Sequence, residues 1–286
     1  MRLRLLVLDA YDDAGRRALS SVGATHAGVL YARLLERLCP GATVDVASFR
    51  EPGFALPSGS TVADYDGVVW TGSNLTIHQD TPAVRDQLAF ARQSLAAGLS
   101  SFGSCWAAQV AVTATGGRCA ANPKGREFGI GRQIVLTAAG RAHPMFEGKA
   151  SVFDAPTSHE DHVVELGPHA TLLASNEFSV VQAVSVEHGP GSFWAVQYHP
   201  EFSLFDVARL GVLRAPQLVA QGFLRSREEA EAYAAELEAL ERDPARKDIA
   251  FRLGIGPDVL DVERRTREVA NWIRRRVASG SPSHER

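Results

Sequence analysis

AGLSSFGSCWAAQVAVTATGG, residues 97–117, decides the fold of this chain. A short apolar segment ends at Phe102 and Gly103, and a helical pattern rich in Ala and Val follows until Gly116. The pattern predicts a strand, a tight turn and a helix, with Cys105 at the turn. Such a turn lifts a nucleophilic atom clear of a sheet, and a helix N-terminus behind the sulfur favours thiolate over thiol. The same pattern also fits a buried structural cysteine, because free Cys is among the most buried residue types.

The chain before this stretch has the pattern of an α/β protein. Continuous apolar runs at residues 4–9, 44–47 and 65–70 predict buried parallel strands. Helical spacing of apolar residues predicts helices over 27–38 and 82–97. Strands separated by helices predict a doubly wound fold with a mostly parallel central sheet.

The chain after this stretch changes character. Short apolar runs at 134–137, 152–155, 170–175, 180–186 and 193–197 alternate with turn residues, which predicts an antiparallel sub-sheet. The glycine-rich residues 125–131 lack the strand–GxGxxG–helix context of a dinucleotide site. We expect a domain over residues 1–205 and a helical C-terminal extension over 206–286 that packs on it and ends in a polar tail, 279–286.

Composition narrows the classes of function. The chain has 286 residues and a net charge of −3, so no nucleic acid or membrane surface is implied as a partner. Three cysteines make no disulfide framework, which fits a reducing compartment. Neither a signal-peptide core nor a membrane-spanning stretch is present in the pattern, and we expect a cytoplasmic protein.

A second informative stretch is FWAVQYHPEF, residues 193–202. A buried strand runs into His199, and Glu201 follows two residues later. Side chains two apart in an extended segment point the same way, so the carboxylate can hold one ring nitrogen while the other faces a thiol. A His and an acid at this spacing are common by chance, so the pair alone is a weak signal. The turn at Gly72 and Ser73, after a predicted strand, offers backbone N–H groups to an oxyanion or is an ordinary loop.

Together these motifs resemble the class I (triad) glutamine amidotransferases. GSCWAAQ at 103–109 is similar to the family pattern G-x-C-x-G-x-Q, and YHPE at 198–201 to its later H-P-E. GREFG at 125–129 and SHED at 158–161 resemble segments of the GMP-synthetase-type amidotransferase domain. The chain departs from the family at Ala107, where the second elbow glycine stands, and at 71–74, TGSN, where the usual turn is Gly-Gly-Pro.

The resemblance implies a mechanism. Cys105 would attack the γ-amide of glutamine or of a γ-glutamyl compound and form a thioester. His199 would transfer the proton and Glu201 would orient His199. The remaining roles implied by the family are the oxyanion hole, from Gly72, Ser73 and Trp106, and binding of the substrate's α-amino and α-carboxylate groups, by Gln109, Ser158 and His159. No cofactor and no metal are implied, since His159, Asp161 and His162 are not completed to a metal set.

Three functions remain open at this point. The first is a glutamine amidotransferase or glutaminase that passes ammonia to a separate synthase subunit. The second is a stand-alone γ-glutamyl hydrolase or peptidase. The third is a catalytically silent binding protein on the same fold.

Overall fold

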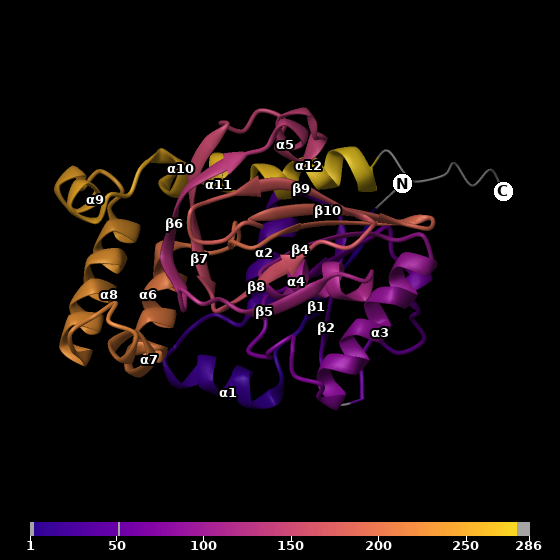
Figure 1. Cartoon of the computed structure of the whole chain (residues 1–286), viewed down its shortest axis with the longest axis horizontal. Helices are drawn as coiled ribbons and strands as arrows, with labels where there is room; N and C mark the ends of the chain where they lie inside the picture. The colour runs from indigo at the N-terminus through magenta and orange to yellow at the C-terminus, as the bar shows by residue number, and fades with distance from the viewer. Residues whose placement is uncertain (1–2, 51, 279–286) are drawn as a thin grey trace.

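A nine-stranded sheet forms the centre of the molecule in a computed structural model that describes residues 3–50 and 52–278 (Figure 1). Neighbouring strands within its first half are parallel. In spatial order these are β2 (Thr43–Ser48), β1 (Arg4–Asp9), β3 (Gly67–Trp70), β4 (Ser100–Ser104) and β11 (Gly191–Val196). The predicted mostly parallel α/β centre is confirmed.

Antiparallel strands continue the same sheet beyond β11. They are β10 (Ala183–His188), β9 (Ala170–Ser175), β6 (Glu127–Leu136) and β7 (Val152–His159). A separate antiparallel pair joins β5 (Arg118–Ala121) to β8 (Asp161–Glu165). The predicted antiparallel portion is therefore present both as a continuation of the main sheet and as this small pair.

Helices cover both faces of the sheet because successive side chains of β1 point to opposite sides. Leu5 and Val7 belong to one apolar cluster, into which α2 (Ala27–Leu38) packs Tyr31. Leu6 belongs to a second cluster on the other face, together with buried residues of α3 (Pro82–Ala96) and α4 (Trp106–Ala114). All of these β1 side chains are fully buried, which is why the strand reads as an unbroken apolar run.

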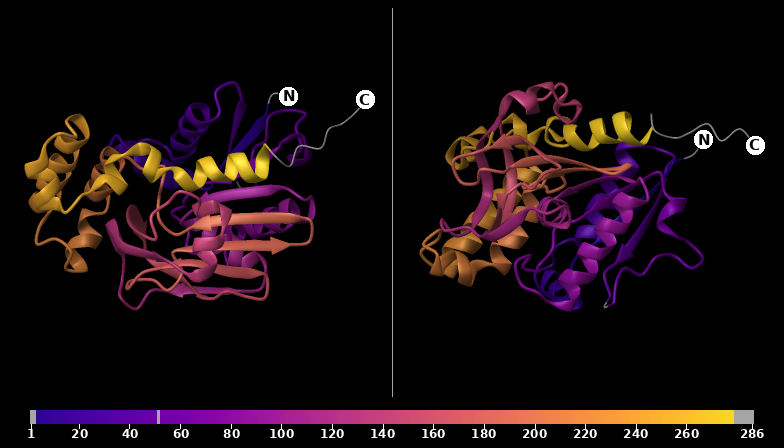
Figure 2. Two further views of the ribbon diagram at one scale, coloured as in Figure 1. Left: turned by 90° about the horizontal axis from the view of Figure 1, so that it is seen from above. Right: turned by 45° about the vertical axis from the view of Figure 1, so that its right-hand side comes forward.

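The C-terminal helices return to the centre of the sheet. Trp272 and Val269 are fully buried in the same cluster as Leu5. The Trp272 indole donates a hydrogen bond of 2.9 Å to Ser100 at the start of β4. Figure 2 shows this segment, in yellow, running alongside the sheet. The helices of this part are α6 (Leu204–Leu213), α7 (Ala215–Ala220), α8 (Arg227–Arg242), α9 (Lys247–Leu253), α10 (Pro257–Leu260), α11 (Val262–Arg265), α12 (Arg267–Trp272) and a π-helical turn, η3 (Ile273–Val277). The predicted polar tail lies outside the described residues.

Several elements differ from the expected boundaries. Helix α1 (Asp13–Ser21) was not predicted, although Asp12 caps it by accepting a hydrogen bond of 2.7 Å from the Gly15 N–H. Strand β6 begins at Glu127, inside the glycine-rich stretch. It is bulged before Ile134, and Gly129 adopts a φ of +86°. Glycines supply such backbone angles without strain, so the stretch is a distorted strand. The short elements η1 (Val62–Asp64), α5 (Ala138–Ala142) and η2 (Pro144–Phe146) complete the fold.

No helix among residues 3–50 and 52–278 combines the length and the apolar character that crossing a membrane requires.

Candidate active site

Cys105 lies on a strained turn between β4 and α4. Its φ of 53° and ψ of −97° lie in a region that side-chain-bearing residues rarely adopt. Its backbone N–H donates a hydrogen bond of 2.8 Å to the Val196 carbonyl at the end of β11. A Cβ on Gly103 would lie 2.4 Å from the Trp70 carbonyl oxygen and 2.5 Å from the Ala107 Cβ. The Ala107 methyl group therefore fits at the elbow because residue 103 is glycine.

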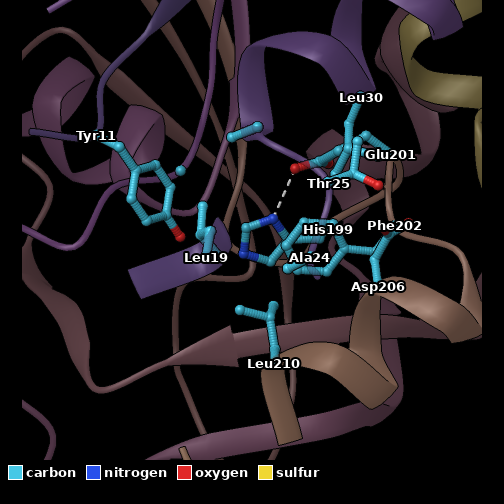
Figure 3. Close-up of a pocket in the computed structure, with 12 residues that line it drawn as sticks. Tyr11, Leu19, Ala24, Thr25, Leu30, His199, Glu201, Phe202, Asp206 and Leu210 are labelled. Carbon is cyan, nitrogen blue, oxygen red and sulfur yellow. Dashed lines mark hydrogen bonds and ion pairs between the residues drawn. The ribbon is translucent and has the colours of Figure 1, made fainter. Parts of the chain in front are cut away.

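His199 follows directly behind the end of β11 and is held on two sides. Its Nδ1 is 2.7 Å from Glu201 Oε1, and that oxygen also accepts a hydrogen bond of 2.8 Å from the Ser104 hydroxyl. The imidazole stacks on Phe202 with a centroid distance of 3.9 Å and an angle of 3° (Figure 3). With Nδ1 engaged by Glu201, Nε2 is the ring nitrogen left for another partner.

The Cys105 side chain and the His199 ring meet around Gly72. A Cβ on Gly72 would lie 2.9 Å from His199 Cε1, 3.8 Å from His199 Nε2 and 3.8 Å from Cys105 Cβ. Burial lowers the pKa of His199, but the charge of Glu201 and a hydrogen bond with the Cys105 side chain outweigh burial and raise it to about 10. The arrangement thus favours an imidazolium paired with Glu201 and beside the sulfur.

The residues predicted for the oxyanion hole border the same space. Within the described part of the chain, the backbone N–H groups of Gly72 and Trp106 donate to no acceptor. The Ser73 hydroxyl is already engaged, since it donates to the Ala10 carbonyl at 2.8 Å and accepts from the Leu75 N–H at 3.2 Å. Any contribution of Ser73 to an oxyanion would therefore come from its backbone. The oxyanion role of all three residues stays a prediction.

A cavity of about 140 Å³ opens beside Cys105, and the three predicted substrate-binding residues line it. Gln109 Nε2 donates to the Asp161 carbonyl at 3.2 Å. The Ser158 carbonyl accepts from the Cys105 thiol at 3.7 Å, and the buried Ser158 hydroxyl has no hydrogen-bond partner. Ser158 therefore has a polar group to offer a bound molecule, and its substrate role stays a prediction.

His159 lines the cavity with both ring nitrogens already engaged. Nε2 is 2.7 Å from Glu127 Oε2, and Nδ1 is 3.0 Å from the Asp161 carbonyl. Asn176 and Gln182 donate to the same Glu127 carboxylate. Burial raises the pKa of Glu127, but these hydrogen bonds and the His159 ring lower it overall. His159 thus joins the ends of β7 and β8, and direct contact with a substrate stays a prediction.

Two arginines at this cavity were not assigned a role from the sequence. Arg126 precedes β6 in the GREFG segment, which resembled the family but indicated no function for this side chain. Arg214 follows α6. In the amphipathic pattern of this region it looks like any other charged surface residue, so no signal in the sequence points to it. Both line the cavity beside Cys105.

The C-terminal helices hold the segment around His199. The Tyr198 hydroxyl donates to the buried carboxylate of Glu268 in α12, which also pairs with Lys149 at 2.8 Å. Arg265 Nε donates to the Pro200 carbonyl at 3.3 Å. Residues on both sides of His199 are therefore fixed by side chains from α11 and α12.

A second, much smaller cavity of about 10 Å³ lies against His199, and Figure 3 shows the Tyr11 hydroxyl turned toward the ring. This volume is close to the minimum for one water molecule. Leu19 and Leu210 give it an apolar lining. Burial raises the pKa of Tyr11 to about 12, so its hydroxyl stays protonated at neutral pH.

Within residues 3–50 and 52–278, no group of three or more His, Cys, Asp or Glu side chains is arranged to hold a metal ion.

These features define the chain as an α/β protein with an elbow cysteine and a neighbouring histidine–carboxylate pair. The sequence model of the family "Glutamine amidotransferase class-I" matches residues 40–206. The chain belongs to this family, as the resemblance predicted.

Curated relatives include hydrolases and part of a synthase. The chain is 32% identical over 281 residues to a gamma-glutamyl-L-1-hydroxyisopropylamide hydrolase of a Pseudomonas species, covering 95% of this chain and 92% of that protein. It is 30% identical over 138 residues to one subunit of the glutamine-hydrolysing GMP synthase of Ignicoccus hospitalis, covering 48% of this chain and 68% of that protein. These relatives support an enzyme of the hydrolase type.

Solved structures agree on the fold. A glutamine amidotransferase from Methylobacillus flagellatus matches with a TM-score of 0.63 at 17% identity, covering 96% of this chain and 95% of that one. A glutamine amidotransferase from Thermotoga maritima matches with a TM-score of 0.62 at 14% identity, covering 90% of this chain and all of that one.

Proposed function

We propose that this protein hydrolyses the γ-amide bond of γ-glutamyl amides, with Cys105, His199 and Glu201 as its catalytic triad. The observation that carries the proposal is the extent of its similarity to the Pseudomonas hydrolase. That similarity covers 95% of the chain, whereas the family model ends at residue 206. The similarity to the hydrolase therefore includes the helices that hold Tyr198 and Pro200 and the helix end that brings Arg214 to the cavity.

The geometry supports the following steps. The Cys105 thiolate attacks the γ-carbonyl carbon, and the oxyanion is stabilised by the N–H groups of Gly72 or Ser73 and of Trp106, at about 3 kcal/mol per donor. The proton on His199 Nε2 passes to the departing amine as the carbon–nitrogen bond breaks. The resulting γ-glutamyl thioester is attacked by water, from which His199 takes a proton. Glutamate leaves and the thiolate is restored.

Glu201 has two effects in these steps. Its hydrogen bond with Nδ1 keeps Nε2 directed at the sulfur, and its charge stabilises the imidazolium that forms when His199 holds a proton. Ser104 and the Phe202 ring restrict the pair to one orientation. The nucleophile and its base are thus positioned before substrate binds.

A second candidate is release of ammonia from glutamine for a separate synthase subunit. The similarity to the GMP synthase component favours it. Both reactions use the same thioester, and they differ in the amine that leaves.

The test is turnover by the purified chain of L-glutamine, γ-glutamyl ethylamide and the γ-glutamyl amide of L-2-amino-1-propanol, which is the 1-hydroxyisopropylamide of the Pseudomonas relative, with glutamate and the amine quantified by mass spectrometry. We expect hydrolysis of the substituted amides and loss of turnover in Cys105→Ser. Cys39→Ser, which changes a partly exposed cysteine, is the matched control and should retain activity. Cleavage of glutamine alone would support the second candidate, and full activity of Cys105→Ser would contradict the triad.

A further inference from the structure

The cavity beside Cys105 contains two guanidinium groups with unused donors. Arg126 is only 7% exposed, and its buried Nε has no hydrogen-bond partner. The Nε of Arg214 is likewise buried without a partner. Each guanidinium has donors arranged in a planar fork. Buried donors without a protein partner require an acceptor from elsewhere, either a bound ligand or water.

The acidic side chains of the cavity are already paired. The Glu160 carboxylate accepts from Arg126 and, at 3.0 Å, from Gln221. Asp161 Oδ2 lies 3.5 Å from His78 Nδ1, a contact that is an ion pair when His78 carries a proton. Arg214 makes no ion pair with any residue in 3–50 or 52–278 and thus contributes a positive charge that the protein does not neutralise.

The two guanidinium groups also repel each other. Burial, and then the charge of Arg214, lower the pKa of Arg126, although Glu160 acts in the opposite direction. Like charges that lie close together disfavour each other's charged form. Glu160 offsets this effect at Arg126 only in part, and a carboxylate bound beside Arg214 would offset it further.

Arg214 also stands where two cavities meet. With Asn74 it borders both the cavity of Cys105 and a more open cavity of about 310 Å³. Residues of α1 and Gln217 of α7 line the open one. An anion on Arg214 can thus belong to the part of a substrate inside the inner cavity or to a part that extends outward.

We propose that Arg126 and Arg214 form a carboxylate-binding subsite that selects the substrate. The proposal rests on the proposed hydrolysis of γ-glutamyl amides. The ligand is a carboxylate on the substrate, either the α-carboxylate of the γ-glutamyl group or a carboxylate on the amine half, as in a γ-glutamyl peptide. A guanidinium fork binds a carboxylate through two parallel hydrogen bonds, which fixes the orientation of the bound molecule as well as its charge.

The test compares Arg214→Gln and Arg126→Gln with the unmodified chain on three donors. These are γ-glutamyl ethylamide, its α-carboxamide analogue and γ-glutamylglycine. If the α-carboxylate is bound, each variant lowers kcat/KM roughly ten- to hundred-fold on the ethylamide and on γ-glutamylglycine, as expected for a lost charge-assisted hydrogen bond. The loss should appear mainly in KM, and the variants should hardly change the already slow reaction of the α-carboxamide.

If the amine half carries the bound carboxylate, the loss is confined to γ-glutamylglycine. Arg214→Lys keeps the charge without the fork and should retain part of the affinity, so it also serves if Arg214→Gln fails to fold. Arg227→Gln is the matched control, because the Arg227 side chain is 77% exposed on the nearby α8. We expect its kinetics to be unchanged.

Less than a twofold change for Arg214→Gln and Arg126→Gln on all donors that the unmodified chain hydrolyses would overturn the subsite and leave the hydrolase function intact. Lack of turnover by the unmodified chain on every donor would instead contradict the proposed function. In that event calorimetric binding of L-glutamate and of glycine decides on the subsite. The subsite is supported if the unmodified chain binds L-glutamate or glycine and Arg214→Gln does not. It is overturned if both proteins bind with equal affinity, or if the unmodified chain binds neither compound.

Discussion

Replacing Glu201 by Gln removes the carboxylate paired with His199 and leaves a side chain of the same size. Burial alone lowers the pKa of His199, and Glu201, with the Cys105 side chain, raises it to about 10. The difference from the ordinary value of 6.5 corresponds to about 5 kcal/mol, at about 1.4 kcal/mol per pKa unit. Loss of one adjacent opposite charge lowers a pKa by about 1–3 units. We therefore expect His199 to titrate at about pH 7–9 in Glu201→Gln instead of at about 10.

The same change alters how stability depends on pH. A group whose pKa is raised by folding stabilises the folded state fully below its unfolded pKa, here 6.5, and loses that contribution as the pH rises through the folded value of about 10. The free energy of unfolding of the unmodified chain should therefore exceed that of Glu201→Gln most clearly near pH 6.5. The gap should narrow progressively toward pH 10.

Two measurements test this prediction. The first is an NMR titration of histidine Cε1–H signals in labelled protein, with His199→Asn used to assign the resonance. The second is urea unfolding at about pH 6.5, 8 and 10. Glu231→Gln, which alters an exposed carboxylate on α8, should leave both results unchanged. A His199 signal that stays protonated up to pH 9 in Glu201→Gln would refute the assigned role of the carboxylate.

Two further substitutions test the packing that positions the site. Trp272→Ala should lower the free energy of unfolding by about 3–5 kcal/mol in urea titrations, because the indole is fully buried against the sheet. Phe251→Ala, at a side chain that is 91% exposed, should cost less than about 0.5 kcal/mol, and equal effects would contradict the packing argument. Gly103→Ala should cost roughly 1–3 kcal/mol and reduce kcat, because the new methyl group would lie 2.4 Å from the Trp70 carbonyl oxygen. Gly256→Ala, where the added methyl group meets no atom within 4 Å, is its control, and a Gly103→Ala enzyme as stable and active as that control would argue against the tight elbow.

Local signals explain the elements that the sequence predicted well. Helix α2 spans residues 27–38 as predicted, because its apolar spacing ends at Cys39 and Pro40 follows. Helix α1 was missed because its nine residues, Asp13–Ser21, have little apolar character and depend on the cap from Asp12. Strand β6 was predicted to begin at Ile134, seven residues too late. The glycines of its first half have no side chains, so they do not contribute to the apolar pattern by which a strand is recognised.

The residues of the candidate site likewise fall into those that local sequence patterns predict and those that they do not. The elbow at Cys105 and the spacing of His199 and Glu201 are local patterns and could be read directly. Arg126 and Arg214 could not be found in this way, because their function depends on which cavity their side chains reach. His159 lines the cavity and its ring nitrogens contact Glu127 and the Asp161 carbonyl, while its predicted role at the substrate stays a prediction.

The sequence by itself determined the α/β class and the turn at Cys105, because backbone preferences and apolar periodicity act over a few residues. The family was indicated by the resemblance of residues 103–109 and 198–201 to its motifs. Only the tertiary structure decided how the C-terminal helices support Tyr198 and Pro200, and how Arg214 reaches the cavity of the cysteine. These contacts join residues far apart in the chain. They arise from burial of apolar faces such as that of Trp272, and no local pattern encodes which faces will meet.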